Sequence, residues 1–155
     1  MQGLDPHDWK AKRFENYLAS ITRIQAAGIS VNGTFVLGLD SHTTDIFAEM
    51  RDFVRASNLL EVQLTVQTPF PGTPLYERLQ KSDRLLTNRY WDRCTLFDVN
   101  YMPLNMSVEE LESGFRWLAG EVYNDQEFTR RKRHYMDLTR QRTQRLRDVE
   151  FLKCG

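Results

Sequence analysis

The spacing of apolar residues in the first forty positions predicts one helix and then one strand. Between residues 8 and 27, apolar side chains recur at spacings of three, four or multiples of these, the period of an amphipathic helix. We expect Asp8 to cap its start and Gly28 to follow its end. The next stretch, Ile29–Asp40, is almost continuously apolar around Thr34–Leu39, which predicts a strand covered on both faces.

A second helix and a second strand follow the same pattern. Ser41–Asn58 places five apolar residues on one side of a helix, and Ser41, Thr43 or Thr44 is its expected N-cap. Leu59–Gln67 is rich in β-branched residues and predicts a strand. Two strands joined by a helix with short connections indicate a βαβ unit with parallel strands. Because two strands make a poor sheet alone, either more strands lie in the later half or the unit belongs to something larger.

The second half is predicted to be mainly helical. Pro74–Lys81 reads as a short helix with proline in its first turn, followed by an aromatic stretch that resembles a β-hairpin. Ser107 and Glu110 form the S-x-x-E pattern of a capping box before an apolar stripe. A long helix is expected over residues 125–155. Its segment 130–147 holds eight basic residues and one acid, a net charge of +7.

Composition narrows the classes of function. The 155 residues hold 21 basic and 21 acidic side chains, so the net charge of zero gives no overall attraction to nucleic acid or membrane. No apolar run approaches the roughly 18 residues of a membrane span, and the N-terminus is too polar for a signal peptide. The two cysteines, Cys94 and Cys154, have no metal-ligand spacing. We therefore expect a cytoplasmic protein without a membrane span.

Candidate binding residues follow both predicted strands. Ligands of parallel α/β folds sit at the carboxyl ends of the strands. Gly38 there allows a close approach and Asp40 offers a carboxylate. Gln67, Thr68 and Pro69 precede a turn in which three of the five prolines fall within six residues. Proline restricts the loop to few shapes, which suits a preorganised binding rim. The alternative is that these prolines only end a strand and start a helix.

Other chemically capable residues give weaker signals. The three histidines, His7, His42 and His134, are scattered, although His42 shares the strand-end loop with Asp40. Cys94 has no activating neighbour in the sequence, so a packed thiol is the better interpretation. Aromatic residues between positions 90 and 101 line a pocket or, as we prefer, pack the core: Tyr90, Trp91, Phe97 and Tyr101.

The "F-x-L-G-x-D" strand followed by "TPFPGTPLY" resembles the later part of radical S-adenosylmethionine (SAM) enzymes, over roughly residues 8–150. The subgroup that carries an N-terminal cobalamin-binding domain is the most similar. The resemblance implies an α/β fold, a fragment of a partial (β/α)6 barrel with parallel strands. Residues 1–82 would supply its fifth and sixth strands, and residues 83–155 a mainly helical C-terminal extension with the long basic helix.

The resemblance also implies cofactors, and this chain lacks the ligands for one of them. Enzymes of the family bind SAM and a [4Fe-4S] cluster held by C-x-x-x-C-x-x-C, a motif absent from this sequence. Cobalamin would bind to a separate N-terminal domain. The chain then looks like the C-terminal segment of a larger, split or truncated enzyme, inactive alone. Gly38, Asp40, Gln67, Thr68 and Pro69 would contribute to its SAM and substrate wall.

Two hypotheses of another class remain open. The chain could be an interaction module that pairs with a separately encoded barrel half, its complementary subunit. The basic tail could instead bind nucleic acid or an anionic membrane. We prefer a solvated helix face or docking onto the rest of the barrel, because acidic residues flank the basic segment.

Overall fold

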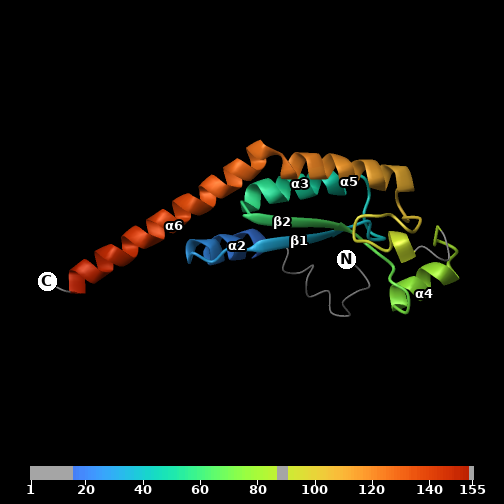
Figure 1. The fold of residues 1–155 in the computed structure, drawn as a ribbon, viewed down its shortest axis with the longest axis horizontal. Coiled ribbons are helices and arrows are strands. Elements are labelled where there is room, and N and C mark those ends of the chain that lie inside the picture. The colour runs from blue at the N-terminus through green and yellow to red at the C-terminus, as the bar shows by residue number, and fades with distance from the viewer. Residues whose placement is uncertain (1–15, 87–90, 154–155) are drawn as a thin grey trace.

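A computed structural model describes residues 16–86 and 91–153 of the chain. Two strands and a series of helices alternate in the first half, and helices dominate the second half (Figure 1). In chain order the elements are α2 (Tyr17–Ala26), β1 (Asn32–Leu37), α3 (Ile46–Ser57), β2 (Glu61–Val66), α4 (Pro74–Lys81), the 3-10 turn η2 (Trp91–Arg93), α5 (Val108–Tyr123) and α6 (Asp125–Lys153).

The two strands form a parallel pair, as the sequence predicts. The register runs without a shift from Asn32 opposite Glu61 to Leu37 opposite Val66. Within the described residues the sheet has only these two strands. The hairpin-like stretch adds no further strand there. It contributes a single antiparallel bridge between Leu85 and Tyr101. The fold is therefore mixed α/β with a parallel pair.

One face of the sheet carries the hydrophobic core. Side chains alternate between faces along each strand, so Phe35 and Leu37 share a face with Leu64 and Val66. The helices α3 and α5 lie side by side next to the strands (Figure 1). Phe35 meets Phe53 of α3 edge to face, with ring centroids 5.8 Å apart. Buried core residues of the two helices include Phe47, Val54, Leu111, Leu118 and Val122.

The expectation that the first strand is covered on both faces is wrong for the described chain. Thr34 and Val36 point to the face opposite the core and are exposed, Val36 by 43%. The apolar run is also shorter as a strand than predicted, because Gly38 adopts a φ of +83°, which ends the extended conformation after Leu37. The strand thus shows the one-sided burial of a sheet with a single helical layer.

Helix boundaries agree with the predictions at some ends and differ at others. Gly28 has the positive φ expected after the end of α2. Residues 8–15, with the expected cap Asp8, lie outside the described residues. The predicted N-cap of α3 is wrong: the helix starts at Ile46, and no side chain caps it. Instead the Ile46 N–H donates to the backbone carbonyl of Thr43 at 3.2 Å.

The predicted capping box at the start of α5 is confirmed. Glu110 N–H donates to Ser107 Oγ at 3.1 Å, and Ser107 N–H donates to Glu110 Oε2 at 2.7 Å. The short helix α4 has the predicted limits, with Pro74 in its first turn after Thr73 as N-cap. Both helices begin where the sequence supplies a hydroxyl acceptor for their first free N–H groups.

The first turns of α6 are bonded to α3 and α5, and further along the helix Arg142 lies against Gly28 at the end of α2. Arg131 is buried and donates from Nη1 to the carbonyl of Val122, at the end of α5, over 2.8 Å. Arg55 of α3 pairs with Glu121 at 3.1 Å and with Glu127 at 3.2 Å. The C-terminal part of α6 extends away from the rest of the chain (Figure 1), and all residues of 141–148 are exposed.

Two glycines of α5 provide a test of the packing of α3 against α5. A Cβ on Gly114 would lie 2.1 Å from Cε2 of Phe47, whereas a Cβ on Gly120 would meet nothing within 4 Å. We expect Gly114→Ala to destabilise the protein by about 2 kcal/mol through overpacking. Gly120→Ala should stabilise it by about 0.5–1 kcal/mol through helix propensity. Urea unfolding measures both, and equal effects of the two variants would contradict this packing.

Candidate functional site

The carboxyl ends of both strands meet at one edge of the sheet. The backbone N–H of Gln67 donates to the carbonyl of Leu37 over 2.8 Å, which extends the pairing one step beyond the strands. Gly38 and Asp40 therefore follow β1 at the same edge where Gln67 and Thr68 follow β2. The structure thus brings together the two segments that hold the predicted site residues. We call this region the strand-end site.

Gly38 makes room for side chains of the protein itself. The Tyr101 hydroxyl donates to the Gly38 carbonyl, and a Cβ on Gly38 would lie 2.2 Å from that hydroxyl. It would also lie 2.9 Å from Leu111 Cδ2. Burial raises the pKa of Tyr101, so its hydroxyl keeps the proton that it donates. The sequence argument allowed another backbone or a ligand beside Gly38; the structure places Tyr101 and Leu111 there.

Asp40 is the centre of a charged cluster. Its carboxylate pairs with Arg84 at 2.8 Å and with Arg78 at 2.9 Å. Arg84 is mostly covered, and its Nε also donates to the carbonyl of Met102 at 2.7 Å. Asn105 Nδ2 donates to the Asp40 backbone carbonyl at 2.7 Å. Asp40 therefore joins the loop after β1 to α4 and to the 102–105 loop.

Gln67 is the least satisfied polar group of the strand-end site. Its side chain is 8% exposed, and its Oε1 is buried without a hydrogen-bond partner in the described chain. Most buried polar atoms are paired, because an unpaired one costs about 1–3 kcal/mol. The amide follows a strand and precedes the proline-rich turn. An unpaired carbonyl oxygen there is suited to accept a hydrogen bond from a ligand.

Thr68 and Pro69 fix the loop beyond Gln67. Thr68 Oγ1 lies 2.7 Å from the carbonyl of Thr95 and 3.1 Å from the carbonyl of Val66, both within hydrogen-bond reach of its hydroxyl. Pro69 is fully buried. The rigid loop expected from the prolines is therefore attached to the segment around Thr95, and the next residue, Phe70, is exposed.

The outer edge of β2 is closed by hydrogen bonds from distant segments. Leu64 N–H donates to the Tyr123 hydroxyl at 3.0 Å, and that hydroxyl donates to the Val62 carbonyl at 3.1 Å. Val66 N–H donates to the Leu96 carbonyl at 2.7 Å. These bonds occupy the backbone groups that a further strand would need. No strand of the described chain pairs with the opposite edge, that of β1.

The histidines and Cys94 do not gather into a site. His42 Nδ1 accepts a hydrogen bond from Leu39 N–H at 3.4 Å, and burial lowers its pKa, so the neutral ring is favoured. His134 lies on α6, and His7 is outside the described residues. Cys94 is partly covered, and burial raises the pKa of its thiol, which disfavours the reactive thiolate. Where the chain is described, no three His, Cys, Asp or Glu side chains are grouped to hold a metal ion.

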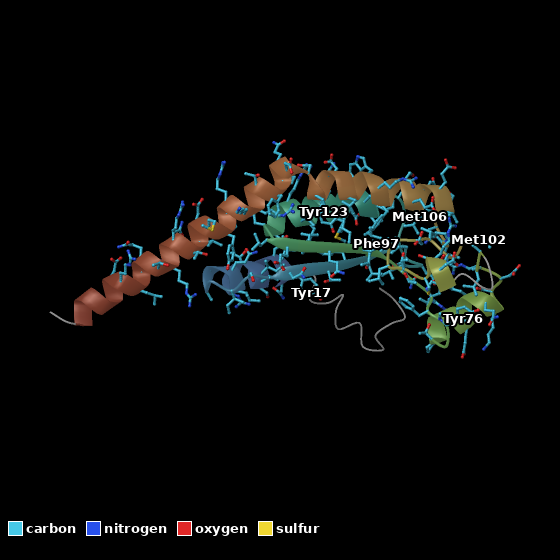
Figure 2. The ribbon with its side chains drawn as sticks, viewed as in Figure 1. Tyr17, Tyr76, Phe97, Met102, Met106 and Tyr123 are labelled. Atoms are coloured by element: carbon cyan, nitrogen blue, oxygen red, sulfur yellow. The ribbon has the colours of Figure 1, made fainter. Side chains whose placement is uncertain are left out.

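The aromatic residues between positions 90 and 101 divide between core and surface. Tyr101 is fully buried, in line with core packing, whereas Phe97 is 61% exposed (Figure 2). Tyr90 and the side chain of Trp91 lie outside what the structure describes. None of the described helices is long and apolar enough to cross a membrane.

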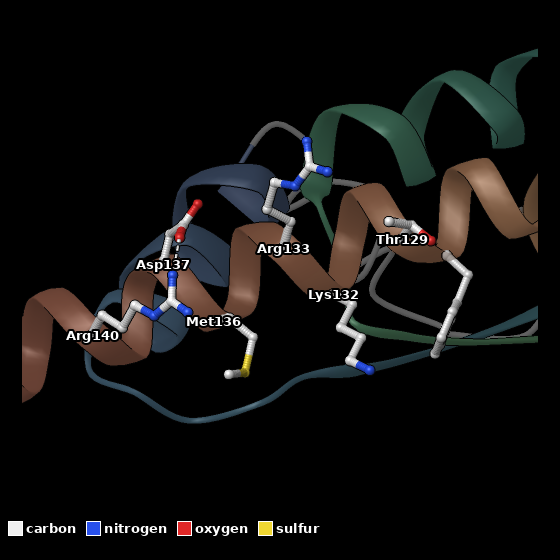
Figure 3. Close-up of a pocket in the computed structure, with 7 residues that line it drawn as sticks. Thr129, Lys132, Arg133, Met136, Asp137 and Arg140 are labelled. Carbon is white, nitrogen blue, oxygen red and sulfur yellow. Dashed lines mark ion pairs between the residues drawn. The ribbon is translucent and has the colours of Figure 1, made fainter.

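A shallow groove of about 440 Å³ lies on α6, away from the strand ends. It combines cationic side chains with the exposed Phe128 and Met136 (Figure 3). Arg140 pairs with Asp137 at 3.5 Å, while Lys132 and Arg133 extend from the helix surface. The groove offers positive charge and apolar contact, but no buried polar group comparable to Gln67 is among its lining residues.

Comparison with known families identifies the second half of the chain. The family model described as "Domain of unknown function (DUF4070)" matches residues 73–153, which is just over half of the 155 residues. The chain belongs to the DUF4070 family. The DUF4070 match starts at Thr73, the N-cap of α4, and includes both α5 and α6.

A curated relative matches a larger share of the chain than the family model does. The chain is 27% identical over 113 residues to the bacteriochlorophyllide d C-12(1)-methyltransferase of Chlorobaculum tepidum. The aligned part covers 73% of this DUF4070 chain but 24% of the relative, so the chain spans about a quarter of the relative's length. Both matches fit the resemblance to the C-terminal part of a radical SAM enzyme.

Sequence reasoning missed the partners of the predicted residues. Arg78 and Arg84 lie about 40 residues from Asp40, and only the fold brings their guanidinium groups to its carboxylate. Tyr101 carried the signal of an aromatic residue in a helix-free stretch, but nothing pointed to Gly38 as its acceptor. The sequence signal for such partners is limited to single cations and aromatic residues in predicted loops. Only the fold shows which residue each of them contacts.

The tight fit at Gly38 can be tested against a second glycine of similar backbone conformation. Gly72 has a φ of +78°, and its Cβ would meet nothing within 4 Å. Gly72→Ala should cost about 1 kcal/mol, the strain of the left-handed region alone. Gly38→Ala should cost about 3 kcal/mol, because overpacking against Tyr101 adds to the same strain. Thermal unfolding of both variants would measure the difference. A Gly38 variant no less stable than the Gly72 variant would refute the contact.

Proposed function

We propose that the chain is the C-terminal segment of a radical SAM enzyme, of the methyltransferase class to which its curated relative belongs. In this proposal β1 and β2 are the fifth and sixth strands of a partial (β/α)6 barrel. The strand-end site forms part of the SAM and substrate wall. The observation that carries the proposal is the parallel, unshifted pairing of β1 and β2, which places Gly38 and Asp40 beside Gln67, Thr68 and Pro69.

The two sheet edges support this position in a barrel. Tyr123 and Leu96 occupy the outer edge of β2, which suits the last strand of a sheet. The edge of β1 has no strand partner in the described chain, which suits a strand that continues into the first four. The partner is then the N-terminal barrel half, either in the same protein or as a complementary subunit. The uncovered face with Thr34 and Gln63 would line the barrel interior.

The residues of this chain fit SAM better than they fit an iron-sulfur cluster. The sequence has two cysteines and no C-x-x-x-C-x-x-C motif, so cluster ligands would come from outside it. SAM, when bound, supplies the group-transfer and radical chemistry of such an enzyme. The chain's own contribution is to bind and orient. In this proposal Gln67 Oε1, which has no partner in the described chain, would accept a hydrogen bond from the ligand, and the buried Pro69 would keep the wall rigid. Cobalamin would bind to a separate domain.

Titration of the isolated chain with SAM tests the proposal. We expect weak binding at millimolar SAM, with amide NMR shifts confined to residues 38–40, 67 and 68. The amides of 141–148 on α6 serve as the internal control, because that segment lies far from the strand ends. Incubation with iron and sulfide should yield no stoichiometric cluster absorbance and no methyl transfer. Shifts absent from the strand ends, or a bound cluster, would overturn the proposal.

The exposed cations of α6 favour a second candidate, an interaction module for nucleic acid. Lys132, Arg133, Arg145 and Arg147 are all exposed on a helix that extends from the body. Such charges can displace counterions from phosphates, and binding of this type weakens steeply with salt. Electrophoretic mobility shift with duplex DNA and with single-stranded RNA at 50 and 200 mM salt tests it. No complex at 50 mM salt would exclude this candidate and leave α6 as a solvated or docking helix.

A further inference from the structure

One exposed face of the long helix α6 carries its apolar side chains. At about 100° per residue, six exposed residues fall within about 80° of one another around the helix. We define them as the α6 stripe: Phe128, Lys132, Met136, Thr139, Thr143 and Leu146. The apolar members Phe128, Met136 and Leu146 are 49%, 44% and 56% exposed. At 1.5 Å per residue, the stripe runs for about 27 Å along α6.

A row of arginines borders this stripe on one side. Arg133, Arg140 and Arg147 are spaced seven residues apart, so they lie within about 40° of one another, and all three are exposed. Arg140 pairs with Asp137 at 3.5 Å, and neither Arg133 nor Arg147 forms an ion pair with a described residue. Charges that flank an apolar stripe at heptad spacing select the partner when two helices pair. We call these three residues the arginine row.

The opposite face of α6 is polar and contains acids. About 150° from the centre of the stripe lie four polar residues: Asp137, Gln141, Gln144 and Asp148. Gln144 Nε2 donates to Asp148 Oδ1 at 2.9 Å. A helix that is solvated on all exposed sides has no need to keep apolar residues, arginines and acids on separate faces. The separation indicates that the stripe and the arginine row face a bound partner, while the polar face stays in solvent.

The stripe can be covered without leaving a hydroxyl donor unpaired. Thr139 Oγ1 donates to the Tyr135 carbonyl at 2.9 Å, and Thr143 Oγ1 donates to the Thr139 carbonyl at 3.0 Å. Both hydroxyl protons are therefore satisfied within α6 itself. Nearer the body, the groove of about 440 Å³ already gives the stripe a concave surface (Figure 3). Its lining includes members of the stripe and of the arginine row: Phe128, Lys132, Met136, Arg133 and Arg140.

We propose that the stripe and the arginine row bind an acidic amphipathic helix supplied from outside this chain. The partner helix lies along α6, with apolar residues on the stripe and carboxylates opposite the arginines. Its charge follows from the arginine row, because opposite charges on paired helices attract and like charges repel. The α6 of a second copy would bring arginines against arginines, so a second copy is not the occupant.

The composition of the stripe also distinguishes a protein helix from other anionic partners. Nucleic acid would neutralise the arginines but leave the apolar side chains without a matching surface. A membrane-bound helix buries a broad apolar face in the lipid. Here Lys132 and two threonines interrupt three apolar residues over five turns, which is a narrow face of that kind. A partner helix matches both the width and the charge of this surface.

Two arginines of equal exposure provide the matched test. The probe is a fluorescein-labelled peptide of three heptads with Leu at positions a and d and Glu at e and g, titrated with the full chain and followed by fluorescence anisotropy. Arg147→Glu should weaken its binding about fivefold, because a favourable charge contact becomes repulsive. Arg145→Glu makes the same charge change about 140° away from the arginine row, and should weaken binding less than twofold.

The apolar contact is tested by a second pair of variants. Leu146→Ser removes a 56% exposed side chain of the stripe, so the protein should fold normally and bind the peptide about fivefold more weakly. Leu104→Ser removes a 62% exposed side chain from a loop at the other end of the chain, and should change binding less than twofold. The peptide with Lys in place of Glu should not bind.

Each contrary outcome overturns the inference. It fails if the Glu peptide does not bind at 50 mM salt, or if Arg145→Glu weakens binding as much as Arg147→Glu. Tighter binding to duplex DNA or to phosphatidylserine vesicles would assign the arginine row to phosphates. A dimer that Leu146→Ser dissociates would make a second copy the occupant. The result is independent of the SAM titration, because the peptide should shift amides of 128–146 on α6 and leave those of 38–40 unchanged.

Discussion

The hydrogen bond from Gln67 N–H to the Leu37 carbonyl determines the geometry on which the site depends. It carries the parallel pairing past the last strand residues, and so fixes where both following loops begin. A one-residue slip would move every side chain of β2 to the other face and take Leu64 and Val66 out of the core. The burial of these core residues against α3 and α5 therefore also holds the strand-end site in register.

The outer edge of β2 is covered by groups from later in the chain. An unpaired strand edge invites association, and proteins usually cover it. Here Tyr123 uses one hydroxyl both to accept from Leu64 and to donate to Val62, while Leu96 accepts from Val66. Both groups come from the DUF4070 part of the chain. The family region thus covers the outer edge of the last strand.

The sequence predicted most elements because their signals are local. Apolar periodicity located the helices, and Ser107 with Glu110 and Pro74 located two helix starts correctly. The predicted cap of α3 was wrong because several hydroxyl residues precede a helix that starts with backbone bonds alone. The division at residues 82 and 83 and the partial barrel stay predictions. The arginine partners of Asp40 and the bond from Tyr101 to Gly38 depend on long-range contacts, which periodicity does not encode.

The two polar candidates of the strand-end site differ in what a ligand would have to displace. Asp40 already pairs with Arg78 and Arg84, and a ligand that took its carboxylate would have to break those contacts. Loss of the carboxylate partner would cost more at Arg84, which is mostly covered, than at the exposed Arg78. Gln67 Oε1 has no partner to lose, but it is buried, so a ligand would first have to displace the groups that cover it. Asp40 is thus better suited to hold the loops in place than to contact a ligand.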